Sequence, residues 1–266
     1  MNIVLVHGVL GFREKFGIEY FRGVAEHFRK RGLRVFVPEL DPTRGIEVRG
    51  AQLRDQVTSA FGSGALESGA KTHIIAHSMG GLDSRYALSP ANPDGLAIPV
   101  RSLTTVSTPH RGSPVADALD ETIDFNPFPH LPFSPPGNPL ESALHALGIS
   151  LDSMRNLTTG FCRDFSARYV DRADVTYFSV AGVGRPAFPQ TAGPLLLFHQ
   201  FIWAKTGQPN DGMVPKASAD WGTIDFQPWF ADHSEEIGYN LDHLAAPPVF
   251  PYLAKYDEIV ARVADL

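Results

Sequence analysis

A serine between a strand pattern and a helix pattern is the residue best placed for chemistry in this sequence. Ser78 lies in the segment 76–81 (AHSMGG), directly after the strand pattern 71–76 and before a helical pattern. A strand, a sharp turn and a helix in this order are typical of a nucleophile elbow, which exposes a serine hydroxyl. The strained turn needs small neighbours, and Ala76 and Gly80 are small. We predict that Ser78 is a nucleophile, and the alternative is an ordinary serine in a glycine-rich turn.

A glycine-rich turn after the first strand pattern could stabilise a negatively charged intermediate. Residues 7–11 (HGVLG) follow the strand pattern 2–7, and a loop at that place can direct a backbone N–H at an oxyanion. The predicted donors are the amides of Val9 and Met79, the second of which begins a helix whose dipole favours negative charge. Such turns also bind phosphate. The sequence contains neither GxGxxG nor GxxxxGK[ST], so a nucleotide site has little support.

A serine nucleophile needs a general base, and the base needs an acid to orient it. Where a serine stands in such an elbow, the acid and then the base follow it along the chain. His243 lies in a late loop before the last helical pattern and is the predicted base, with His233 as its competitor. The remaining histidines after Ser78 lie in an early loop or in insertions: His110, His130, His145 and His199.

The predicted acid is Asp211, in the polar turn 210–215 (NDGMVP). An aspartate held in a turn of this kind can reach a histidine imidazole. Three other aspartates remain as alternatives, and each could equally be a solvated loop residue: Asp220, Asp232 and Asp242.

Composition limits the class of protein. The 266 residues are 43% apolar and 20% charged, which fits a soluble globular domain. The net charge of -6 argues against a nucleic-acid partner, because phosphate contacts need clustered positive charge. The single cysteine, Cys162, excludes an intramolecular disulfide and a cysteine-based zinc site. No run is long enough for a transmembrane helix or a secretory signal, so we expect a cytoplasmic protein.

Strand and helix patterns alternate through the first half of the chain, and this predicts an α/β fold. We expect one domain over 1–266, with a mostly parallel sheet and helices on both faces. Two insertions interrupt it, a Pro-rich and apolar segment at 117–157 and a second apolar segment at 183–206. If the first is a lid over Ser78, its apolar side chains would bind substrate, whereas in the alternative they only pack a loop onto the core. These side chains are Phe125, Phe128, Leu131 and Phe133.

Together these segments resemble the bacterial true lipases of the Pseudomonas and Burkholderia type, the family I lipases of the α/β-hydrolase superfamily. The resemblance implies an α/β-hydrolase fold with an inserted helical lid, through which the protein would contact a lipid interface. It also implies a triad of Ser78, Asp211 and His243. The segments that carry it are 7–12 (HGVLGF), 47–53 (EVRGAQL), 77–81 (HSMGG), 108–113 (TPHRGS), 210–212 (NDG) and 242–244 (DHL).

This chain departs from those lipases in three ways. Many carry a disulfide, which is impossible here, and they usually carry a signal peptide. They also usually have an acidic residue two positions after the catalytic histidine, which helps to bind calcium. Two positions after His243 stands Ala245, which has no side-chain oxygen. We therefore expect no metal site, and no cofactor is required.

These features predict a serine carboxylic-ester hydrolase, most specifically a triacylglycerol lipase that works through an acyl-enzyme. Within the enzymes, the alternatives are a soluble short-chain carboxylesterase or thioesterase, or an acyltransferase that excludes water. Outside them, the alternative is a catalytically inactive lipid-binding protein that kept the fold. Labelling of Ser78 by a fluorophosphonate would separate the two classes.

Overall fold

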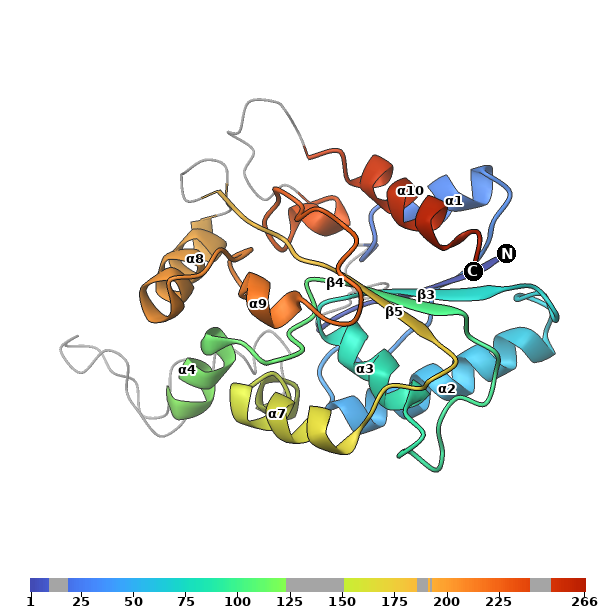
Figure 1. Ribbon diagram of the computed structural model, residues 1–266, viewed down its shortest axis with the longest axis horizontal. Coiled ribbons are helices and arrows are strands. Elements are labelled where there is room, and N and C mark those ends of the chain that lie inside the picture. Colours follow the sequence, from blue (N-terminus) through green and yellow to red (C-terminus); the bar gives the residue numbers. More distant parts are fainter. Residues whose placement is uncertain (10–18, 123–150, 186–190, 192, 240–249) are drawn as a thin grey trace.

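Five parallel strands form one sheet in the order β2-β1-β3-β4-β5 (Figure 1). The structure is a computed structural model, and it describes residues 1–9, 19–122, 151–185, 191, 193–239 and 250–266. The predicted α/β class with a parallel sheet is confirmed. The strands are β1 (Asn2–Val6), β2 (Arg34–Phe36), β3 (Thr72–His77), β4 (Ser102–Val106) and β5 (Thr176–Val180).

The central strands β1, β3 and β4 are buried at every position because both faces of the sheet are covered. Along β1, Val4 and Val6 pack into one layer of the core, while Ile3 and Leu5 pack into the other. This alternation follows from the two-residue period of a strand. A parallel sheet buried on both sides therefore reads as an unbroken apolar run in the sequence.

Two pairs of helices cover the two faces (Figure 1). On one face lie α2 (Ile46–Gly62) and α3 (Met79–Leu88), and on the other lie α1 (Val24–Lys30) and α10 (Tyr252–Val263). Helix α2 buries Leu53 and Val57, one turn apart, against the sheet, so its apolar stripe faces the core.

The carboxyl ends of the central strands meet at one edge of the sheet. In the register of the sheet, Val6 pairs with Ala76, and His77 pairs with Val106. The turns that follow β1, β3 and β4 therefore begin side by side. In open α/β sheets, ligands bind at this edge.

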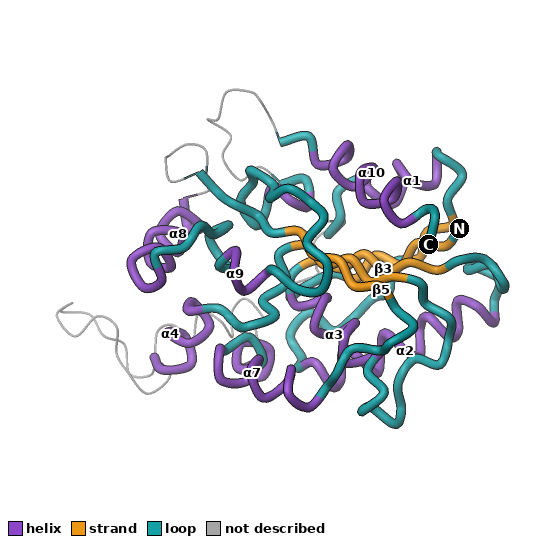
Figure 2. The backbone as a smooth tube through the Cα atoms, viewed as in Figure 1, coloured by secondary structure: helices purple, strands orange, loops and turns teal. Residues whose placement is uncertain are grey.

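Further helices lie beyond that edge, with long loops between them (Figure 2). No helix among the described residues is long and apolar enough to cross a membrane. Most of the expected lid, including Phe125, Phe128, Leu131 and Phe133, lies outside the described residues; the second insertion contains helix α8. The further helices are α4 (Pro114–Thr122), α6 (Leu151–Arg155), α7 (Thr159–Arg168), α8 (Gly193–Thr206), α9 (Lys216–Ala219) and the 3-10 turn η1 (Glu235–Ile237).

Candidate active site

Ser78 occupies a strained turn between β3 and α3. Its φ of 56° and ψ of -133° lie in a region that side chains other than glycine rarely adopt. Two hydrogen bonds hold the turn: Ser78 N–H donates to the Val106 carbonyl at 2.9 Å, and Thr108 Oγ1 donates to the Ser78 carbonyl at 2.7 Å. A Cβ at Gly80 would lie 2.5 Å from the Val6 carbonyl oxygen, so position 80, two residues after Ser78, has no room for a side chain. The geometry is that of the predicted elbow.

The loop after β1 is held by its carbonyl groups. The Gly8 carbonyl oxygen lies 2.8 Å from His7 Nδ1 and accepts from Arg49 Nη2 at 3.3 Å, and the same Nη2 donates to the His7 carbonyl at 2.7 Å. In a planar trans peptide the C=O and the N–H point in opposite directions. Anchoring the Gly8 carbonyl therefore fixes the direction of the Val9 N–H. The oxyanion roles of Val9 and Met79 stay predictions, which this geometry supports.

Arg49 itself is held by a buried ion pair. Its Nε donates to Asp83 Oδ2 at 2.8 Å, and both side chains are fully buried. Burial raises the pKa of Asp83 to about 6, although Arg49 opposes that shift. The pair connects α2, α3 and the loop after β1.

We expect that Arg49→Met lowers the free energy of unfolding by about 3–5 kcal/mol, because it leaves the Asp83 carboxylate buried without its partner. Urea denaturation measures this loss. The matched control is Arg54→Met on the same helix, where a pair with the exposed Asp55 contributes less than about 1 kcal/mol. Equal losses in the two variants would contradict the role assigned to the buried pair.

Asp211 orients a histidine, and that histidine is His233. Asp211 Oδ1 accepts the backbone N–H groups of Met213 and Val214, both at 2.7 Å, so the polar turn fixes the carboxylate. Asp211 Oδ2 lies 2.7 Å from His233 Nδ1, and the His233 N–H donates to the Asp211 carbonyl at 3.0 Å. A carboxylate at Nδ1 places the hydrogen there and leaves Nε2 to act as a base.

In the structure Asp211 thus contacts His233, which the sequence offered as the alternative to His243. His243, the predicted base, lies outside the described residues, and so does Asp242. The other two candidate acids have partners elsewhere: Asp232 Oδ1 accepts the Ser234 and Glu235 N–H groups at 2.9 Å each, and Asp220 pairs with Lys216 at 2.8 Å.

Sequence position could not separate the two histidines, because each lies in a late loop before a helical segment. Ser78 Oγ forms no hydrogen bond with His233 among the described residues. Such catalytic hydrogen bonds are often long before substrate binds. His233 nevertheless lies close to the turn that carries Ser78. The centroid of its ring is 4.5 Å from that of His77, the residue before Ser78.

Comparison with known proteins finds lipases among the relatives of this chain. No family model matches the chain. A triacylglycerol lipase of Vibrio cholerae is 28% identical over 88% of this chain and 78% of its own length. A triacylglycerol lipase of Pseudomonas fragi is 27% identical over 89% of this chain and 87% of its own length. The chain is homologous to triacylglycerol lipases. The expected resemblance is confirmed.

The fold of this lipase homologue is also confirmed. The crystal structure of a metagenomic carboxyl esterase matches all of the chain and 76% of the esterase, with a TM-score of 0.76 and 23% sequence identity. At that identity the match speaks for the fold alone, which is the α/β-hydrolase fold that the sequence predicted.

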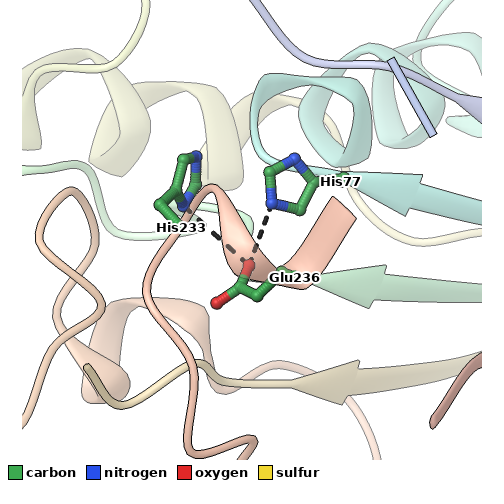
Figure 3. A group of neighbouring side chains, drawn as sticks. All are labelled: His77, His233 and Glu236. Carbon is green, nitrogen blue, oxygen red and sulfur yellow. Dashed lines mark hydrogen bonds and ion pairs between the residues drawn. The ribbon is translucent and has the colours of Figure 1, made fainter. Parts of the chain in front are cut away.

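The lipase homologue also contains a buried cluster that sequence analysis missed (Figure 3). His77 Nε2 lies 2.9 Å from Glu236 Oε2, and the same oxygen is 4.0 Å from His233 Nδ1. Burial raises the pKa of Glu236 well above its usual value and lowers the pKa of His77 well below its own. His77 ends β3, whereas Glu236 lies 159 residues later in η1. No short motif could have signalled this pairing.

The same three side chains are also of the types that bind zinc. Their ligand atoms lie within 4.8 Å of one another. Each is already engaged, however, since His233 Nδ1 is hydrogen-bonded to Asp211 and His77 Nε2 to Glu236. A metal ion would have to break the Asp211–His233 pair, so we interpret the cluster as a hydrogen-bonded network. The expectation of no metal site stays a prediction. Its argument from Ala245 assumed that His243 is the catalytic histidine, and two positions after His233 the sequence has the acidic Glu235.

Proposed function

We propose that this chain is a serine carboxylic-ester hydrolase, most specifically a triacylglycerol lipase, with Ser78, Asp211 and His233 as its catalytic triad. The proposal rests on the strained turn at Ser78 and on His233, whose Nδ1 is 2.7 Å from the buried Asp211 and whose ring lies 4.5 Å from that of His77. Homology to triacylglycerol lipases supports hydrolase activity and a lipid ester as substrate. The order of the three residues along the chain is also the one expected for this fold.

In the proposed reaction, His233 Nε2 takes the proton of the Ser78 hydroxyl while Oγ attacks the ester carbonyl. Asp211 stabilises the imidazolium that forms. The amides of Val9 and Met79 bind the oxyanion. The C–O bond to the alcohol then breaks, and the alcohol leaves with the proton from His233. His233 then deprotonates a water molecule that attacks the acyl carbon, the C–Oγ bond to Ser78 breaks, and Oγ takes the proton back from His233 as the fatty acid leaves. These steps require no cofactor.

The acyl chain of the substrate is proposed to bind to the inserted lid, through Phe125, Phe128, Leu131 and Phe133. A lipase must receive a long apolar chain from an aggregate, and the aromatic and aliphatic side chains of this insertion would offer apolar surface for it.

A series of esters of increasing acyl length tests the lipase proposal. Each buried methylene contributes about 0.8 kcal/mol, so kcat/KM should rise by up to about fourfold per methylene until the pocket is full. The measurement uses p-nitrophenyl esters from acetate to palmitate, together with emulsified glycerol triesters. Highest activity on the acetate, with none on emulsions, would instead identify a short-chain esterase.

A further inference from the structure

A buried chain of hydrogen bonds runs from Tyr20, next to the loop after β1, through His77 to Glu236, which lies next to His233. The Tyr20 hydroxyl lies against Gly8, where a built Cβ would meet it at 2.7 Å, and it is 2.7 Å from His77 Nδ1. His77 Nε2 in turn lies 2.9 Å from Glu236 Oε2 (Figure 3). The chain therefore begins beside the predicted oxyanion donor Val9 and ends at a carboxyl group.

The far end of this chain fixes which Glu236 oxygen accepts a hydrogen bond. Ser107 Oγ accepts the Gly182 N–H at 2.9 Å, so its own hydrogen is directed to Glu236 Oε1, 2.7 Å away. Ser107 holds this position in the left-handed region, at φ 45°. A Cβ at Gly182 would come within 1.7 Å of Glu236 Oε1, so only glycine leaves room for the carboxyl group. Oε1 thus acts as an acceptor, and Oε2 faces the imidazole.

The charged and titratable groups around Glu236 disfavour its ionisation. The carboxyl group is fully buried, and no lysine or arginine forms an ion pair with it in the described part of the chain. The neighbouring carboxylate is Asp211. A Cβ built at Gly182 would meet both side chains, Asp211 at its Cβ and Glu236 at Oε1, and the charge of Asp211 raises the pKa of Glu236. Two carboxyl groups in one buried site hold a proton between them. The other titratable groups that face Glu236 are His77, His233, Asp232, Tyr20 and Tyr256.

Asp211 is the better placed of the two carboxyl groups to remain ionised. It accepts two backbone N–H groups and lies against His233 Nδ1. Hydrogen bonds to a charged form favour that form. The shared proton therefore belongs on Glu236.

We propose that Glu236 stays protonated while the enzyme works and donates its hydrogen to His77 Nε2. His77 is then neutral with its hydrogen on Nδ1, which donates to the Tyr20 oxygen that lies against Gly8. Glu236, His77 and Tyr20 are thus positioning residues for the loop that carries Val9. Asp211 alone supplies negative charge to the His233 imidazolium. This inference rests on the proposed function.

The substitution Glu236→Gln tests the proton. A glutamine amide donates through N–H and accepts through its carbonyl, as a protonated carboxyl does, whereas a carboxylate only accepts. We expect kcat/KM to stay within about threefold and the midpoint of the acid limb of its pH profile to move by less than about 0.3 units. If Glu236 were ionised, losing a charge 4.0 Å from His233 Nδ1 would lower that midpoint by about one unit or more, which would overturn the proposal.

A second measurement needs no variant at Glu236. Nitrogen-15 NMR of the wild-type protein with labelled histidine reports the tautomer of His77, and we expect its hydrogen on Nδ1. A hydrogen on Nε2 would refute the proposal even if Glu236→Gln fails to fold. Labelling of wild-type Ser78 by a fluorophosphonate is read in parallel. Its absence would refute the proposed hydrolase function, which the tautomer alone does not address.

The positioning role is tested by Tyr20→Phe, which keeps the ring and removes the oxygen. The loop at Gly8 then loses the hydroxyl that packs against it and His77 Nδ1 loses its partner, so we expect kcat to fall about tenfold with KM within about twofold, because the oxyanion loop matters most in the transition state. An unchanged kcat would contradict the role, and so would a loss confined to KM.

Discussion

We expect Ser78→Ala to reduce ester hydrolysis by about 10⁶-fold and to leave the fold intact, because loss of the proposed nucleophile removes the whole covalent route. The serine is only 9% exposed, and its backbone is held by the Val106 carbonyl and by Thr108, neither of which contacts its hydroxyl. Alanine can therefore occupy the same turn. The measurements are the initial rate on a soluble ester and the melting temperature.

The matched control for that variant is Ser59→Ala, on the exposed side of α2, which should keep full activity. Fluorophosphonate labelling should disappear in the Ser78 variant and persist in the control. A Ser78 variant that retained a tenth of the activity would remove Ser78 from the mechanism, and with it the proposed triad.

His233→Ala should be nearly as damaging as Ser78→Ala, because nucleophile and base act as a unit. The reason lies in Asp211, whose carboxylate is 2.7 Å from His233 Nδ1 and fixed by two backbone N–H groups. An imidazole held in this way is ready to accept the serine proton through Nε2. Rates on a soluble ester, with and without added imidazole, measure the loss and its rescue.

His243→Ala is the comparison that decides between the two histidines. We expect it to retain most of the activity, since the base assignment follows the Asp211 contact rather than the position in the last loop. If His243→Ala is the inactive variant and His233→Ala the active one, the base is the residue that the sequence placed first, and the Asp211–His233 pair is structural.

Much of the fold was readable in the sequence because it is set by neighbours along the chain. The apolar cores of the segments 2–6 and 72–77, IVLV and IIA, indicate buried strands, and the structure buries every residue of both segments. The turn at Ser78 is local for the same reason, since it directly joins the end of β3 to the start of α3. The Asp211 turn is local too, because the N–H groups that hold the carboxylate follow within three residues.

Contacts between distant segments could not be read in this way. Asp211 and His233 are 22 residues apart, and the loop position of His233 resembles that of His243. The burial of Glu236 could not be predicted from the sequence, because a glutamate next to another glutamate is normally solvated. Only the packing of η1 against the ends of β3 and β4 brings that carboxyl to His77 and Ser107. The sequence therefore predicted the central strands and the turn at Ser78, and it proposed Ser78 and Asp211 as nucleophile and acid. Tertiary structure decided which histidine Asp211 contacts and that Glu236 is buried next to it, because those contacts depend on distances between segments that no local pattern encodes.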